Sequence, residues 1–192
     1  MTNISIPSGL IDENVEMFSF NGQPMGLHAG KVKPLFDLPI SFIDAIEADI
    51  ADNPAAEVAL ELAGFLTKAE KIKKYTVCRF GNFDNSPDFK NGRLMNSEYY
   101  NCGHRGNCPM EGVVCNSLWI KGRVISPFEV KMVELLASDL TLPAVAEKLN
   151  ISLTTFEIRK KVLFEKLQVY SRAGMVAVAY NMQILTPGSC SV

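Results

Sequence analysis

The sequence predicts two units of different class: an α+β N-terminal module over residues 1–120 and an all-α C-terminal domain over residues 121–185. Residues 1–120 carry 10 Lys/Arg and 15 Asp/Glu, a balance of −5, while residues 121–192 carry 9 and 6, a balance of +3. Short apolar segments separated by Gly, Asn and Pro fill the first part, and capped amphipathic helices fill the second. Four cysteines mark a loop-rich, metal-binding segment, residues 78–115, within the first part.

Composition narrows the classes of protein further. The 192 residues are 47% hydrophobic, which is enough for a folded core. No run approaches the roughly 20 apolar residues of a membrane-spanning helix. The first residues lack the basic and apolar regions of a secretory signal, so we expect a cytoplasmic protein. We expect residues 186–192 to form a flexible tail.

The N-terminal module begins with a predicted β-hairpin. Asn21-Gly22 lies between the apolar segments 15–20 and 25–27, and this dipeptide is typical of two-residue hairpin turns. The prolines that bound residues 34–39 predict an extended connection. The module is therefore expected to start with strands and continue into helices.

Two helices are predicted next. The first covers residues 41–50 and is capped by Ser41. The second starts at Asn53-Pro54 and runs to residue 74. Its expected apolar side is formed by Val58, Leu62, Phe65, Leu66 and Ile72. Residues 75–80 are then expected to form a short strand that carries Cys78.

Three cysteines follow a C-x5-C-x6-C spacing in a glycine-rich segment, and Cys78 lies upstream. A reducing compartment disfavours disulfides, so clustered cysteines favour metal binding or redox chemistry. Four thiolates suit tetrahedral zinc, which would supply folding energy to a segment with little core, and His104 could replace one of them. The predicted zinc ligands are Cys78, Cys102, Cys108 and Cys115.

Two other interpretations of the cysteines stay open. The Cys108-Pro109 pair is similar to the Cys-Pro of ferredoxin-type runs, which favours an iron–sulfur cluster. The cysteines can also be small buried apolar residues without a ligand. No catalytic constellation is evident, because His28 and His104 are the two histidines and no phosphate-binding or metalloprotease motif occurs. We therefore expect no enzymatic activity, and we interpret Cys190 as an uninvolved thiol.

Four short helices are predicted in residues 126–184. Ser126 and Glu129 form a capping box, and Thr141, Ser152 and Ser171 open the following helices. A tight turn at Asn150-Ile151 separates the second helix from the third, which is typical of a helix-turn-helix unit. The expected apolar positions of the first three helices are Val130, Val133, Leu136, Ala137, Val145, Ala146, Leu149, Phe156, Leu163 and Leu167.

Residues 125–179 resemble, without gaps, the DNA-binding domain of LuxR-type (GerE-like) transcription regulators. The matching features are Ser126-Pro127 with Glu129, Leu135-Leu136-Ala137, Val145-Ala146 with Leu149, Ile151-Ser152, Thr155, Lys166-Leu167 with Val169, and Ser171-Arg172-Ala173. The resemblance implies a four-helix domain whose third helix enters the major groove of duplex DNA. It implies a sequence-specific transcription regulator of bacterial or phage origin.

The resemblance also assigns residues on the third helix. Glu157, Ile158 and Lys161 are expected to face base edges, although the family usually has a basic residue where Glu157 stands. The residues expected near phosphates or the groove wall are Ser152, Thr154, Thr155, Arg159, Lys160 and Lys166. Exposed apolar positions on the last helix, namely Met175, Val178 and Met182, favour a homodimer on a two-fold operator.

Two other functions stay open. The helical domain could be an adaptor that resembles region 4 of sigma factors and binds polymerase or a phage-type assembly. The cysteines could instead make the protein an iron–sulfur redox sensor. The N-terminal module resembles no family that we recognise, and it is expected to sense metal or redox state, present a partner surface, or simply fold.

Overall fold

The computed structural model describes residues 6–105, 108–182 and 184–185. The predicted tail, residues 186–192 with Cys190, lies outside the described residues. The chain divides into two compact units, which we call the N-terminal unit (residues up to 102 and 109–116) and the C-terminal unit (103–108 and 117 onward). Among the described helices, none is long and apolar enough to cross a membrane.

The N-terminal unit is built on an antiparallel sheet with strand order β3-β2-β1-β4-β5. Its strands are β1 (Val15–Phe20), β2 (Gln23–His28), β3 (Lys31–Pro34), β4 (Phe89–Lys90) and β5 (Arg93–Leu94). Asn21 and Gly22 join β1 to β2 with φ values of 51° and 74°, the positive pair that a two-residue hairpin turn requires. The predicted hairpin is therefore confirmed.

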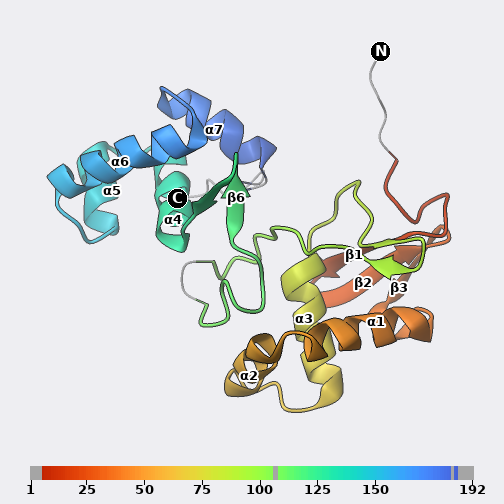
Figure 1. The fold of residues 1–192 in the computed structure, drawn as a ribbon. Coiled ribbons are helices and arrows are strands. Elements are labelled where there is room, and N and C mark those ends of the chain that lie inside the picture. The colour runs from red at the N-terminus through yellow and green to blue at the C-terminus, as the bar shows by residue number, and fades with distance from the viewer. Residues whose placement is uncertain (1–5, 106–107, 183, 186–192) are drawn as a thin grey trace. The chain divides into compact units, whose positions relative to one another are not determined.

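Three helices complete the N-terminal unit: α1 (Ile40–Ala51), α2 (Pro54–Leu62) and α3 (Lys68–Phe80). Figure 1 shows α1 and α3 beside the strands, and α3 contacts both β1 and β2. The predicted apolar face of the first helix is confirmed, because Phe42, Ile43, Ile46 and Ile50 are all buried. The largest fully buried side chains around them include Met17, Leu35, Tyr75, Phe80 and Phe89.

The predicted helix from residue 54 to residue 74 is wrong, because two helices occupy this stretch. Gly64 adopts φ +92° after α2 ends, and Thr67 and Glu70 form a reciprocal capping box that starts α3. The residues expected to form one apolar side are therefore distributed over two helices and the connection between them. Ile72 is buried, whereas Leu62 is 85% exposed and Val58 and Leu66 are also exposed.

Three smaller expectations are also corrected. Residues 75–80 belong to α3 and not to a strand, so Cys78 is a buried helical residue. The connection predicted to be extended contains a 3-10 turn, η1 (Leu35–Asp37). The first helix starts at Ile40 after Pro39, so Ser41 lies inside it and does not cap it. Pro39 has no amide hydrogen to satisfy, which suits a helix start.

Three carboxyl side chains are withdrawn from solvent in this unit: Glu16 on β1 and Asp88 are buried, and Glu98 is half-buried. Glu16 Oε1 accepts a hydrogen bond from the Asp84 amide at 2.7 Å, and Asp88 accepts one from the Met17 amide at 2.6 Å. Burial is the main cause that raises the pKa of Glu16 to about 8, of Asp88 to about 9 and of Glu98 to about 10. These three acids are therefore protonated in the folded unit at neutral pH.

The C-terminal unit contains a hairpin and four helices. These are β6 (Leu118–Ile120), β7 (Arg123–Ile125), α4 (Pro127–Ala137), α5 (Leu142–Lys148), α6 (Leu153–Leu167) and α7 (Arg172–Asn181). Helix α4 contacts α5 and α7, and α6 contacts α5 and α7, so the four helices share one core. Eight of the ten predicted apolar positions are at most 2% exposed, whereas Ala137 and Leu149 are only half-buried.

Candidate nucleic-acid interface

Helices α5 and α6 are joined by a short turn that fixes the start of α6. Asn150 adopts a left-handed conformation with φ +54°, and the Ile151 amide donates to the Ala146 carbonyl at 3.1 Å. Asparagine tolerates this conformation better than most non-glycine residues. The tight turn predicted at Asn150-Ile151 is therefore confirmed.

The first turn of α6 is capped as predicted. Ser152 Oγ accepts a hydrogen bond from the Thr155 amide at 3.2 Å and lies 2.9 Å from the Thr155 hydroxyl. Thr154 is exposed beside this cap. The helix start therefore presents hydroxyl groups and the positive end of the helix dipole, a combination that suits a phosphate.

One side of α6 is fixed in the core and the opposite side is exposed. Phe156, Leu163 and Leu167 are fully buried. The opposite side carries Ile158, which is 62% exposed, and Lys161, which is also exposed. Because residues three or four apart share a helix face, the candidate base-reading residues project away from the core.

The charged residues on α6 have different surroundings. Lys160 Nζ lies 2.6 Å from a carboxylate oxygen of Glu157, which precedes it by three residues on the same helix. The Arg159 guanidinium stacks over the Phe128 ring at 4.5 Å from its centroid. Within the described part of the chain, no carboxylate forms an ion pair with Lys161. Lys161 is therefore the α6 cation that is most available to a phosphate.

Lys166 is held inside the domain. Its ammonium lies 2.8 Å from the Glu129 carboxylate and donates to the Val124 carbonyl at 3.0 Å. Burial opposes ionisation of Glu129, but hydrogen bonds from Lys166 and Ser126 lower the pKa of Glu129 below its usual range. Lys166 thus joins the C-terminal half of α6 to the capping box of α4.

Two arginines contribute contacts that the sequence reasoning did not assign. The Arg172 guanidinium donates to the carbonyls of Leu136, Ser138 and Leu140, which ties the start of α7 to the α4–α5 connection. Arg123 donates to the Glu165 carbonyl at 3.4 Å. The Ser171-Arg172-Ala173 motif pointed to Arg172, but no local sequence pattern marks the contact of Arg123.

Exposed apolar side chains on α6 were also missed. Leu153 and Val162 are exposed together with Ile158. Apolar side chains in the major groove can contact the methyl group of thymine, but they also suit a protein partner. The exposed side of α6 therefore carries the Lys161 ammonium together with an apolar row, which is formed by Leu153, Ile158 and Val162.

Among the described residues, the predicted metal ligands form no group that could hold a metal ion. Cys78 and Cys115 are buried in the N-terminal unit, while Cys102 and Cys108 are half-buried and belong to different units. Over the described ranges, no group of three or more His, Cys, Asp or Glu side chains could hold a metal ion, and His104 joins no such group. The zinc or iron–sulfur site stays a prediction.

The helix predicted to mediate dimerisation buries part of its expected contact surface. Met175 is fully buried against the other helices, so its assignment as an exposed apolar residue is wrong. Met182 is exposed as expected, whereas Val178 is only half-buried. Ala177 and Tyr180 are further exposed positions on α7.

Comparisons with known proteins agree with the helical arrangement of the C-terminal unit. Residues 123–179, 57 of the 192 residues, match the GerE family, described as bacterial regulatory proteins of the luxR family. This segment contains β7 and α4 to α6 with most of α7, so the C-terminal unit carries a LuxR-type helix-turn-helix. Neither the search of curated proteins nor the search of solved structures found a match.

Proposed function

We propose that the protein is a transcription regulator that recognises specific sequences in duplex DNA through α6. The observation that carries this proposal is the geometry of α6 within a segment that matches LuxR-type regulators. Three fully buried residues and a capped N-terminus fix the helix, and Lys161 and Ile158 project from its exposed side. A rigid helix with an exposed reading face is what major-groove recognition requires.

The roles of the site residues follow from their surroundings. Lys161 has no carboxylate partner in the described chain, so it can reach a base edge or a phosphate without breaking an ion pair. Ser152, Thr154 and Thr155 are positioned at the helix start for a phosphate. Glu157 can accept from the amino group of cytosine once Lys160 turns to the DNA backbone. Lys166 has a positioning role through Glu129.

Selection of bound duplexes from a random-sequence pool tests the proposal. The full chain is expected to enrich a common motif, and a labelled duplex with that motif is expected to bind more tightly than a scrambled duplex. Failure to enrich any motif, with equal affinity for both duplexes, would contradict sequence-specific recognition. Enrichment of a two-fold repeated motif would further support a dimer.

We propose that the regulator binds such a repeat as a homodimer through α7. The support is the exposed side of that helix, which carries Ala177, Tyr180 and Met182 with the half-buried Val178 next to them. Small and apolar residues allow close packing of two copies of a helix. Analytical ultracentrifugation of the Ala177→Arg variant is expected to shift the protein toward monomer, and an unchanged distribution would contradict this interface.

A protein partner for α6 is the second candidate function. The exposed apolar row of Leu153, Ile158 and Val162 favours it, because such a row is unusual on a helix that meets only DNA. The candidate partner is bacterial RNA polymerase. Binding of polymerase without any duplex, lost in the Ile158→Asp variant, would favour the adaptor over the DNA reader.

A metal site in the cysteine-rich segment remains a proposal. The C-x5-C-x6-C spacing supports it, and two residues of this segment, 106 and 107, lie outside the described residues. Zinc would serve the fold, whereas an iron–sulfur cluster would make the N-terminal unit a redox sensor.

A further inference from the structure

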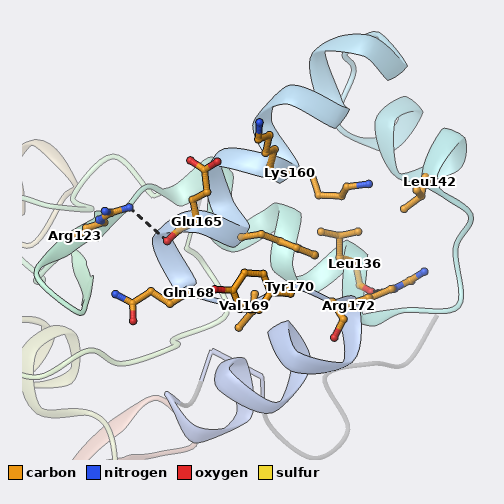
Figure 2. A pocket seen from close by; sticks show the side chains of 12 residues that line it. Arg123, Leu136, Leu142, Lys160, Glu165, Gln168, Val169, Tyr170 and Arg172 are labelled. Carbon is orange, nitrogen blue, oxygen red and sulfur yellow. Dashed lines mark hydrogen bonds between the residues drawn. The ribbon is translucent and has the colours of Figure 1, made fainter.

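A cavity of about 940 Å³ lies within the C-terminal unit, on one side of α6. It is bounded by Arg123 on β7, Leu136 on α4, Leu142 on α5 and the residues that lead into α7. Figure 2 shows Arg123 and Leu142 at opposite ends of this cavity, with Tyr170 between them. Its volume is in the range of pockets that hold small organic molecules.

The cavity has an excess of positive charge. Four cations line it, namely Arg123, Lys160, Lys161 and Arg172, against the single carboxylate of Glu165. Arg123 and Arg172 donate to backbone carbonyls, which carry no net charge, so both keep a positive field toward the cavity. Only Lys160 among the four has a carboxylate partner in the described chain, Glu157.

The cavity also offers apolar and aromatic surface. Leu136, Leu142, Phe164 and Val169 contribute to its lining. Tyr170 is fully exposed, so its ring makes little packing contact within the unit. A cavity lined by both an aromatic ring and an unpaired ammonium can stack a ring and hold an anionic group at the same time.

We propose that this cavity binds a small aromatic acid, a molecule with one flat ring system and one anionic group. Its ring stacks on Tyr170 and contacts Phe164, and its anionic group pairs with Lys161. A concave site favours a small molecule over duplex DNA, which needs a projecting surface. Because Lys161 also belongs to the DNA-reading face, the ligand excludes duplex DNA. That consequence rests on the proposed function, whereas ligand binding itself does not.

A fluorescent probe of this chemistry tests the site in the full chain. The probe is 1-anilinonaphthalene-8-sulfonate, and its matched control is N-phenyl-1-naphthylamine, which has the same rings without the sulfonate. The sulfonate probe is expected to bind more tightly than the neutral control. Equal affinities would overturn the proposed role of the positive charge.

Substitutions test whether the probe binds in this cavity and not on another apolar surface of the chain. Tyr170→Ala and Lys161→Ala are each expected to lower the affinity for the sulfonate probe by about fivefold, while Lys161→Arg retains it. The control is Lys131→Ala, because Lys131 lies on α4 outside the cavity and pairs with Glu134. Circular dichroism verifies that each variant is folded. Unchanged affinity in both cavity variants would overturn the proposal.

Competition connects the site to DNA. A selected duplex is expected to displace the sulfonate probe from the wild-type chain. Simultaneous binding of the duplex and the probe to one chain would overturn the shared use of Lys161. A chain that selects no duplex would contradict the proposed function but would still bind the probe. The two failures are therefore distinguishable.

Discussion

The Lys166 ammonium of α6 lies 2.8 Å from the Glu129 carboxylate of α4. Glu129 also closes the capping box with Ser126, whose amide donates to it at 2.8 Å. One carboxylate thus contacts both the start of α4 and the C-terminal half of α6. The pair helps to fix α6 against α4, because it joins two side chains that are 37 residues apart in the sequence.

Loss of this pair is expected to destabilise the C-terminal unit. Lys166→Met removes the ion pair and keeps the capping box, and we expect it to lower the free energy of unfolding by about 1–2 kcal/mol. Trp119, the single tryptophan of the chain, lies on β6, so its fluorescence follows urea unfolding of this unit. Lys131→Ala is the matched control, since its partner Glu134 lies on the same exposed helix face. An equal midpoint for the wild type and Lys166→Met would contradict the assignment.

The buried carboxyl groups predict that the N-terminal unit weakens at alkaline pH. The folded-state pKa values of Glu16, Asp88 and Glu98 are about 8, 9 and 10. Unfolded carboxyl groups titrate near pH 4, so the folded state holds more protons between about pH 4 and pH 10. The free energy of unfolding therefore decreases as pH rises through this window, because each acid must lose its proton while buried or unfold.

Urea unfolding at pH 6 and pH 9.5 measures this dependence. Far-ultraviolet circular dichroism reports the unfolding of both units. Trp119 fluorescence reports the unfolding of the C-terminal unit alone, so the transition of the N-terminal unit is obtained by comparing the two signals. Glu98→Gln is expected to flatten the pH dependence, because it removes the acid with the highest pKa. The exposed Glu13→Gln serves as control. A stability that increases from pH 6 to pH 9.5 would show that these acids are ionised in the folded unit.

The turn between α5 and α6 predicts a substitution pattern at Asn150. Its φ of +54° disfavours a side chain with a Cβ and no local hydrogen bond, so Asn150→Ala is expected to cost about 1 kcal/mol. Asn150→Gly is expected to change stability by less than about 0.5 kcal/mol, because glycine adopts this conformation freely. Thermal unfolding of both variants checks the order. An alanine variant as stable as the glycine variant would contradict the turn geometry.

The metal proposal predicts a defined stoichiometry. Purified protein is expected to contain about one zinc ion per chain and no visible absorbance, and the Cys102→Ser/Cys108→Ser double variant is expected to lose the metal. An absorbance band near about 400 nm would identify an iron–sulfur cluster instead. Metal analysis that detects neither zinc nor iron at a stoichiometric level would contradict both forms of the proposal.

Local signals made much of the fold predictable. The Asn21-Gly22 hairpin, the Ser126–Glu129 capping box and the Ser152 cap depend on neighbouring residues, and the structure contains all three. The break between α2 and α3 was predictable as well, because Thr67 and Glu70 have the spacing of a capping box. Residues 75–80 were misassigned because their aromatic and β-branched side chains resemble a strand in isolation, although Ile72, Thr76 and Phe80 repeat at helical spacing.

The site was less predictable than the fold. The resemblance identified α6 and its exposed positions, but it placed Lys166 beside phosphate, and the Glu129 contact arises only from tertiary packing. The cavity around Tyr170 likewise arises from tertiary packing, because its lining comes from five elements, β7 and α4 to α7. Short-range patterns fix helix ends, whereas contacts between helices depend on the packed core.

Duplex affinity as a function of salt concentration tests the central claim most directly. Fluorescence anisotropy with a selected duplex is expected to show that affinity falls steeply with salt, because α6 cations displace counterions from phosphates. Lys161→Ala is expected to weaken binding about tenfold and to reduce the salt slope by about one, while Lys131→Ala leaves both unchanged. An absence of duplex binding at low salt, or identical curves for Lys161→Ala and the wild type, would contradict the assignment of α6 as the DNA-reading helix.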